Sequence, residues 1–131
     1  MAGLMILNFG HPLTREQRQS IRELTGQRIS KVIDIGCQFD PQQPFTEQVE
    51  RLMEQMELSA EDWQTLSILV NPPSFAPISC LLMAFIHGFA GHFPAILRLR
   101  PTPGVASQFE VAEIINLQEV RDRARGWRQV K

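Results

Sequence analysis

Apolar and polar positions follow two different spacings along this chain. The short apolar run at residues 4–9 is typical of a strand buried on both faces of a sheet, and residues 28–36 and 67–71 predict two further strands. Between them, apolar side chains recur at helical spacing over residues 46–57. The pattern therefore predicts strands that alternate with helices.

Capping residues set the ends of two predicted helices. Thr14 stands three residues before Gln17, which is the spacing of a capping box, and Gly26 closes the polar helix that follows. Asn116 has the same relation to a glutamate and opens a last helix. We expect this last helix to end near Gly126.

The second half of the chain contains its most apolar segment, residues 78–89. A bilayer span needs about 20 apolar residues, so this segment predicts a buried core helix instead. It follows a stiff elbow, residues 71–74, whose last residue, Ser74, is the expected N-cap. Two more strands, at residues 93–101 and 108–116, flank a Thr-Pro-Gly turn and predict an antiparallel hairpin at one edge.

The order of predicted elements is strand-helix-strand-helix-strand-helix-strand-strand-helix. Such alternation predicts an α/β fold with a mostly parallel central sheet, flanked by helices on both faces, and an antiparallel edge hairpin. The chain shows no internal repeat, low-complexity tract or linker. We therefore expect residues 1–131 to form a single domain.

Composition narrows the classes of function. The net charge of −1 argues against a general nucleic-acid coat, so we expect no DNA partner. Neither a dinucleotide fingerprint nor a P-loop is present, and no cofactor or metal is predicted. Cys37 and Cys80 form no metal motif, and the N-terminal stretch lacks a basic leader region. We expect both cysteines to be reduced and buried thiols. We also expect the protein to be cytoplasmic and to have no membrane partner.

Two loops are candidates for a ligand site, because ligands of open α/β sheets bind beyond the carboxyl ends of strands. Residues 8–14 and 71–79 each lead into a helix N-terminus, which favours an anion. Gly10 permits close approach and Phe75 offers a face for a base. The other candidates in these loops are His11, Thr14, Pro72, Pro73 and Ser74. The elbow is equally consistent with a stiff turn and a helix cap.

Charged residues of the predicted hairpin are a further candidate. Arg98 and Arg100 are two apart in a strand, so they share a face and could meet a phosphate or form ion pairs at the edge. Glu110 and Glu113 have opposite parity and predict no catalytic pair. His87, inside the apolar helix, is expected to be a satisfied core histidine.

Several segments together resemble a known family. They are ILNFGHPLT, QFDPQQPF, LVNPPSFAPI, FPAILRLRP and FEVAEIINLQEVRD, and they resemble the small Csx-group accessory proteins of type III CRISPR systems across essentially the whole chain. The resemblance implies a CARF-like Rossmannoid domain that binds cyclic oligoadenylate across the two-fold axis of a homodimer. Carried onto this chain, the ligand contacts are Asn8, Phe9, Gly10, His11, Asn71, Pro72, Pro73, Ser74 and Phe75.

The resemblance leads to an expected function with two alternatives. The first expectation is a binder that sequesters cyclic tetra-adenylate and damps antiviral signalling, with assembly beyond a dimer left open. The alternative is a metal-independent ring nuclease using 2′-hydroxyl attack, in which His11 protonates the leaving oxygen and Arg98 or Arg100 stabilises charge. Pro-Pro-Ser replaces a glycine-rich turn followed by Thr or Lys, which argues against lysine-assisted catalysis. An outside alternative is a non-catalytic interaction protein.

Overall fold

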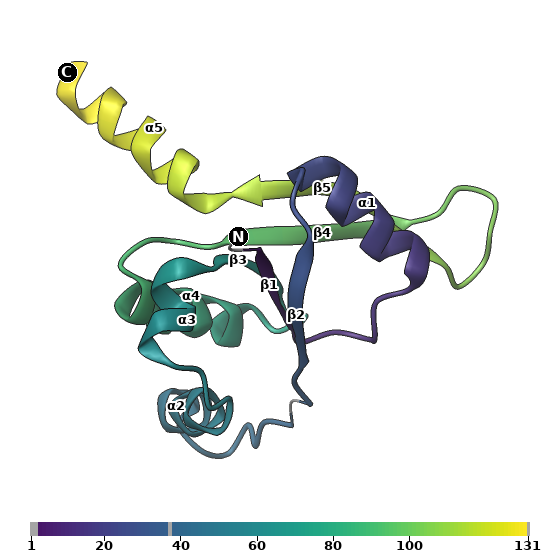
Figure 1. Cartoon of the computed structure of the whole chain (residues 1–131). Coiled ribbons are helices and arrows are strands. Elements are labelled where there is room, and N and C mark those ends of the chain that lie inside the picture. Colours follow the sequence, from purple (N-terminus) through teal and green to yellow (C-terminus); the bar gives the residue numbers. More distant parts are fainter. Residues whose placement is uncertain (1–2, 37, 131) are drawn as a thin grey trace.

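The fold is built on one five-stranded sheet, seen in a computed structural model that describes residues 3–36 and 38–130. Its elements, shown in Figure 1, are β1 (Leu4–Asn8), α1 (Arg15–Thr25), β2 (Ile29–Asp34), α2 (Phe45–Gln55), α3 (Ala60–Thr65), β3 (Ser67–Asn71), α4 (Ala76–Ala90), β4 (Ala95–Pro101), β5 (Phe109–Asn116) and α5 (Leu117–Val130). The predicted order of strands and helices is confirmed, and α3 is one additional short helix between α2 and β3.

The strands lie in the order β2-β1-β3-β4-β5. β2, β1, β3 and β4 run parallel, whereas β5 pairs antiparallel with β4. The predicted class is confirmed in these terms: an α/β fold with a mostly parallel sheet and an antiparallel edge hairpin. Since β2 and β3 lie on opposite sides of β1, the chain changes direction across the sheet between β1 and β3, which is where open α/β sheets hold ligands.

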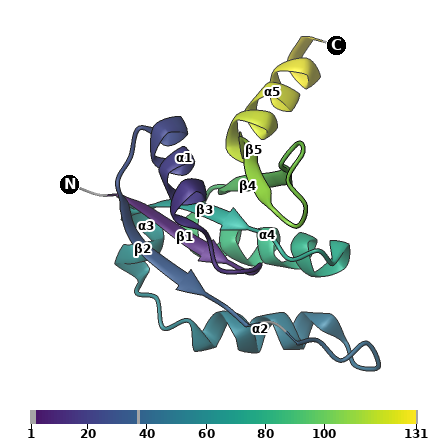
Figure 2. The ribbon, with the colours of Figure 1, turned by 90° about the vertical axis from the view of Figure 1, so that its right-hand side faces the viewer.

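The core has two halves, one on each face of the sheet. Met5 and Leu7 of β1 pack with Val70 against α2, α3 and α4, while Leu4 and Ile6 pack under α1. Figure 2 shows α1 on one side of the sheet and α2 on the other. Every residue of β1 is buried, as expected of a strand covered on both faces.

The ends of the helices follow the capping signals except at Ser74, before α4, and at Gly126, in the last helix. Thr14 and Gln17 form the predicted capping box of α1, and Gly26 ends that helix in the left-handed conformation. Asn116 accepts a hydrogen bond from the N–H of Glu119 at the start of α5. The prediction that the last helix ends near Gly126 is wrong, because Gly126 does not adopt a left-handed conformation and α5 continues to Val130.

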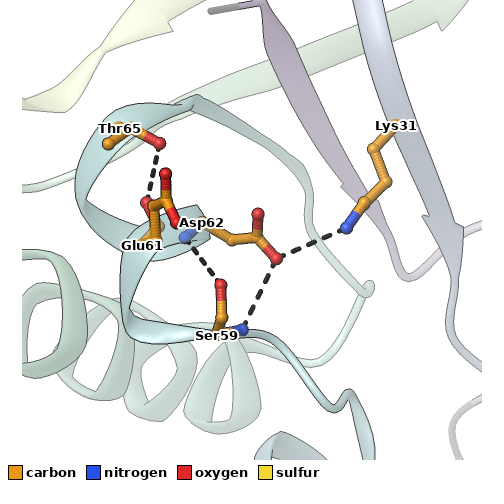
Figure 3. A network of polar contacts seen from close by, with 5 residues as sticks. All are labelled: Lys31, Ser59, Glu61, Asp62 and Thr65. Carbon is orange, nitrogen blue, oxygen red and sulfur yellow. Dashed lines mark hydrogen bonds and ion pairs between the residues drawn. The ribbon is translucent and has the colours of Figure 1, made fainter.

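A polar network joins α3 to the sheet (Figure 3). Asp62 accepts from the N–H of Ser59 and pairs with Lys31 of β2 at 3.4 Å. Desolvation acts in the opposite direction, but these hydrogen bonds and the Lys31 charge hold the pKa of Asp62 below its ordinary value of 3.8. The interaction therefore stabilises the fold above pH 3.8 and weakens as acid protonates Asp62.

α4 buries one side, which consists of Ile78, Leu82 and Ile86. The prediction of a core helix is therefore confirmed for this side of α4, while the opposite side is exposed. Cys80 is exposed, so its predicted burial is wrong, while Cys37 lies outside the described residues. Within residues 3–36 and 38–130, no helix is both long and apolar enough to cross a bilayer.

Candidate functional site

Four loops enclose a hollow at the carboxyl edge of the parallel strands. The hollow has a volume of about 1430 Å³ and lies between the loops after β1, β2 and β3 and the β4–β5 hairpin. Nine predicted site residues line it: Phe9, Gly10, His11, Thr14, Asn71, Pro72, Pro73, Ser74 and Phe75. Asn8, Arg98 and Arg100 do not line it. A smaller hollow of about 620 Å³ adjoins it beside α2 and shares Gly36 and Phe39.

Asn8 holds the loops that form this hollow. Its side chain is fully buried and its amide makes four hydrogen bonds. Nδ2 donates to Asp34 Oδ1 at 2.8 Å and to the His11 carbonyl at 2.9 Å, while Oδ1 accepts from Asn71 Nδ2 at 2.8 Å and from Gly10 N–H at 3.1 Å. These four bonds use the whole hydrogen-bonding capacity of the amide. Asn8 therefore positions the loops after β1, β2 and β3 rather than offering free groups to a ligand.

Gly10 and Asn71 meet inside the hollow. A Cβ atom at Gly10 would lie 2.8 Å from Asn71 Nδ2, so this position has room only for glycine. The Asn71 backbone carbonyl accepts from the N–H of Phe9 at 3.0 Å, which joins the first loop to the end of β3. The Oδ1 of Asn71 makes no hydrogen bond within the described residues and remains a polar group at the hollow.

The elbow before α4 differs from its prediction in one detail. The N-cap is Phe75 and not Ser74, and no side chain caps this helix. Instead, the hydroxyl of Ser79 donates to the carbonyl of Pro73 at 3.0 Å and closes the elbow from within the helix. Phe75 packs edge-on against Phe45 at 5.3 Å between ring centroids and stays 47% exposed. The helix therefore starts with uncapped N–H groups beside an accessible aromatic ring.

Gln17 joins the first loop to the hairpin. Its Oε1 accepts from Thr14 N–H at 2.9 Å, and its Nε2 donates to the carbonyl of Phe109 at 2.8 Å. Gln17 is buried although it belongs to a polar helix. Sequence reasoning identified its capping role and missed the contact with β5, which lies 92 residues further along the chain.

The hairpin side of the hollow was also missed. Thr102, Ser107, Gln108, Phe109 and Glu110 line it. One signal was available: β4 was expected to run parallel to its neighbours, so the turn after it had to lie at their carboxyl edge. The Thr-Pro-Gly turn predicts a connection between strands but gives no sign of its own that it borders a ligand site.

Arg98 and Arg100 share one face of β4, as predicted, and each pairs with a glutamate of β5. Arg98 contacts Glu113 at 2.7 Å and Arg100 contacts Glu110 at 2.7 Å. The spacing of Glu110 and Glu113 predicts that they point to opposite faces of β5, which is wrong. A bulge between Arg98 and Leu99 shifts the register of β5, so that both glutamates lie opposite the arginines of β4. Both arginines are exposed and lie outside the hollow, whereas Glu110, the partner of Arg100, lines it.

The lining of the hollow has an unusual charge pattern for an anion site. Among the described residues that line it there is no lysine or arginine, while Glu16 and Glu110 supply two carboxylates. His11 is exposed, and its side chain makes no hydrogen bond within the described residues. Neutral donors come from Ser20, Ser74, Thr102 and Ser107. No group of three His, Cys, Asp or Glu residues in the described ranges is arranged to hold a metal.

We expect Gln17→Ala to lower the free energy of unfolding by about 1–2 kcal/mol. The change removes one half of the capping box and the bond to Phe109. Gln19→Ala is the matched control on the exposed side of α1 and should cost less than about 0.5 kcal/mol. Urea unfolding measures both variants, and equal losses would contradict a special role for Gln17.

The fold and the site together define an α/β domain with a ligand-sized hollow at the carboxyl edge of its sheet. No protein-family model, curated protein or solved structure matches this chain.

Proposed function

We propose that this chain is a CARF-like domain that binds cyclic tetra-adenylate in the hollow as a homodimer and damps type III CRISPR antiviral signalling by sequestering the ring. The observation that carries the proposal is the convergence of the loops after β1 and β3 at one hollow of about 1430 Å³. A ring of four nucleotides has two-fold symmetry and would be shared between the equivalent hollows of two chains.

The phosphates would be held mainly by neutral donors. α4 starts without a side-chain cap, and the N–H of the exposed Ala76, next to Phe75 at the hollow, precedes the first intrahelical bond, from Ser79 to Phe75. Such a helix start favours an anion without any basic side chain. This mode of binding fits a chain with a net charge of −1.

The adenine bases would be held by Phe75 and Asn71. Phe75 has an exposed ring at the rim, and stacking of a base on an aromatic ring contributes about 1–3 kcal/mol. Asn71 keeps a carbonyl oxygen free inside the hollow, which can accept from an adenine amino group.

The test is a titration with cyclic tetra-adenylate at increasing salt. Contacts from two arginines would lower affinity about 25-fold for a tenfold rise in salt, whereas neutral donors leave it almost unchanged. We expect binding with a change of less than about threefold over that range. Failure to bind the ring would overturn the proposal. A steep salt dependence would indicate that Arg98 and Arg100 contact the phosphates and would contradict binding by neutral donors. Linear tetra-adenylate is the control for ring recognition.

A ring nuclease is the second candidate, and the position of His11 favours it. The side chain lies at the hollow, is exposed and has no internal partner in the described residues, as a proton donor to a leaving oxygen would need. Incubation of the protein with an excess of radiolabelled ring separates the two functions. More than one linear product per site, lost in His11→Ala, would establish cleavage, whereas a ring recovered intact supports sequestration.

A further inference from the structure

α5 extends away from the sheet, as both views of the ribbon show (Figure 1, Figure 2). Each residue from Glu119 to Gln129 is exposed. Isolated helices of about 12–15 residues are only marginally stable in water, because helices in proteins gain most of their stability from packing an apolar face. α5 has 14 residues, and one of them, Gly126, is a poor helix former. α5 therefore has the properties of a helix that is stabilised by contact with a partner.

The apolar side chains of α5 form a narrow stripe, which we call the α5 seam. They recur at intervals of three, four and three residues, the spacing of the a and d positions of a heptad, and are Leu117, Val120, Ala124 and Trp127. Trp127 is 68% exposed, so the largest side chain of the seam is left uncovered. A stripe confined to a and d is typical of a coiled coil and is narrower than the apolar face of a helix that packs on a sheet. The α5 seam therefore fits a single partner helix.

Arginines flank the α5 seam on both sides. Every e and g position of this heptad up to residue 128 is an arginine, namely Arg121, Arg123 and Arg128. Arg121 pairs with Asp122 at 2.9 Å, whereas Arg123 and Arg128 make no ion pair within residues 3–36 and 38–130. The acidic residues of α5, Glu119 and Asp122, fall at positions c and f, away from the seam. Since e and g side chains meet those of the other helix, they determine the charge that a partner must carry.

We propose that α5 is the docking site for an acidic amphipathic helix of a different protein. The partner helix has apolar side chains at its own a and d positions and Asp or Glu at its e and g positions. Its carboxylates meet the arginines beside the α5 seam, and its apolar side chains cover Trp127. A second copy of α5 does not meet these conditions, because parallel and antiparallel pairing both place arginine against arginine.

A lipid surface and a nucleic acid fit the pattern less well. Binding to a lipid surface increases with the apolar area that enters it, and Val120 and Trp127 are the only large apolar side chains that α5 exposes within the described residues. A nucleic acid attracts basic residues through its phosphates, which gives no reason for apolar residues at a and d spacing. The combination of the α5 seam with arginines at e and g therefore favours a helix.

The test uses the whole chain and a synthetic helical peptide of about 28 residues with Leu at a and d and Glu at e and g. Glutamates at e and g keep this peptide from pairing with itself. The control peptide has Lys in place of each Glu. In calorimetric titration at physiological salt, we expect the Glu peptide to bind at least about tenfold more tightly than the Lys peptide.

Charge reversal on α5 tests the contact at one position. Arg123→Glu, at position g, should weaken binding of the Glu peptide at least about fivefold and should strengthen binding of the Lys peptide. A loss of helical structure cannot produce this gain. Arg125→Glu makes the same change at position b, away from the α5 seam, and should change either affinity less than about twofold. Trp127→Ala should weaken binding of both peptides, because it removes the largest apolar contact.

Four results would overturn the proposal. They are a Glu peptide that does not bind, equal affinity for the two peptides, equal losses in Arg123→Glu and Arg125→Glu, and tighter binding to anionic lipid vesicles or duplex DNA than to the Glu peptide. The last result would assign α5 to a membrane or a nucleic acid instead. Cyclic tetra-adenylate is absent from these titrations, so their outcome is independent of the proposed function.

Discussion

Replacing Asn8 by aspartate is expected to lower the free energy of unfolding by about 3–5 kcal/mol. The two side chains have nearly the same shape, so the loss comes from chemistry and not from packing. The buried carboxylate cannot donate to the His11 carbonyl, and it would stand against Asp34, which now lies 2.8 Å from Asn8 Nδ2. Urea unfolding at pH 7 measures the loss.

A double-mutant cycle isolates the part of this loss in unfolding free energy that comes from the contact with Asp34. In Asn8→Asp combined with Asp34→Asn, an amide at position 34 can donate to the carboxylate at position 8 and restore one bond. We expect the double variant to recover about 1–2 kcal/mol relative to the sum of the single changes. Asp34→Asn alone should cost little, since Asp34 is exposed. A loss below about 1 kcal/mol for Asn8→Asp would contradict the role of Asn8 in joining the loops.

The elements of the fold could be predicted because their signals are local. The run from Leu4 to Phe9 is short and almost wholly apolar, and the capping box of Thr14 and Gln17 needs only neighbouring residues. The two strands beside the Thr-Pro-Gly turn pair as a hairpin because little chain separates them. In each case the signal lies within a short segment of the sequence, although β1 itself pairs with the distant strands β2 and β3.

The errors have causes that are not local. The exposure of Cys80 depends on which side of α4 meets the sheet, and a helix that is apolar all round gives no indication of that side. Ser74 was expected to cap α4, but Ser79 closes the elbow from the next turn. The bulge that aligns Glu110 and Glu113 arises from the pairing of β5 with β4. The order of apolar and polar residues within β5 gives no indication of it.

The candidate site was predicted in part for the same reason. The loops after β1 and β3 could be found because each follows a strand and precedes a helix. The role of Asn8 could not be found, because it depends on Asp34 and Asn71, which are brought together only by the order of strands. The contact of Gln17 with Phe109 likewise exists only in the folded sheet.

Gly10→Ala is expected to weaken binding of cyclic tetra-adenylate at least about tenfold and to cost about 1–3 kcal/mol of stability. The new methyl group would lie 2.8 Å from Asn71 Nδ2, which can move away only by breaking its hydrogen bond to Asn8. Either the first loop or Asn71 must move, and both line the hollow. Calorimetric titration and urea unfolding measure the two effects.

Gly36→Ala is the matched control for this change. Gly36 also lines the hollow, but a Cβ there would meet nothing within 4 Å, so both affinity and stability should stay close to those of the unchanged chain. If Gly10→Ala lowered the stability but not the affinity, binding of the ring would not depend on the contact between Gly10 and Asn71. If both variants lost affinity equally, crowding of the hollow would explain the result. Only a loss of affinity confined to Gly10→Ala would show that ligand binding depends on the contact between Gly10 and Asn71.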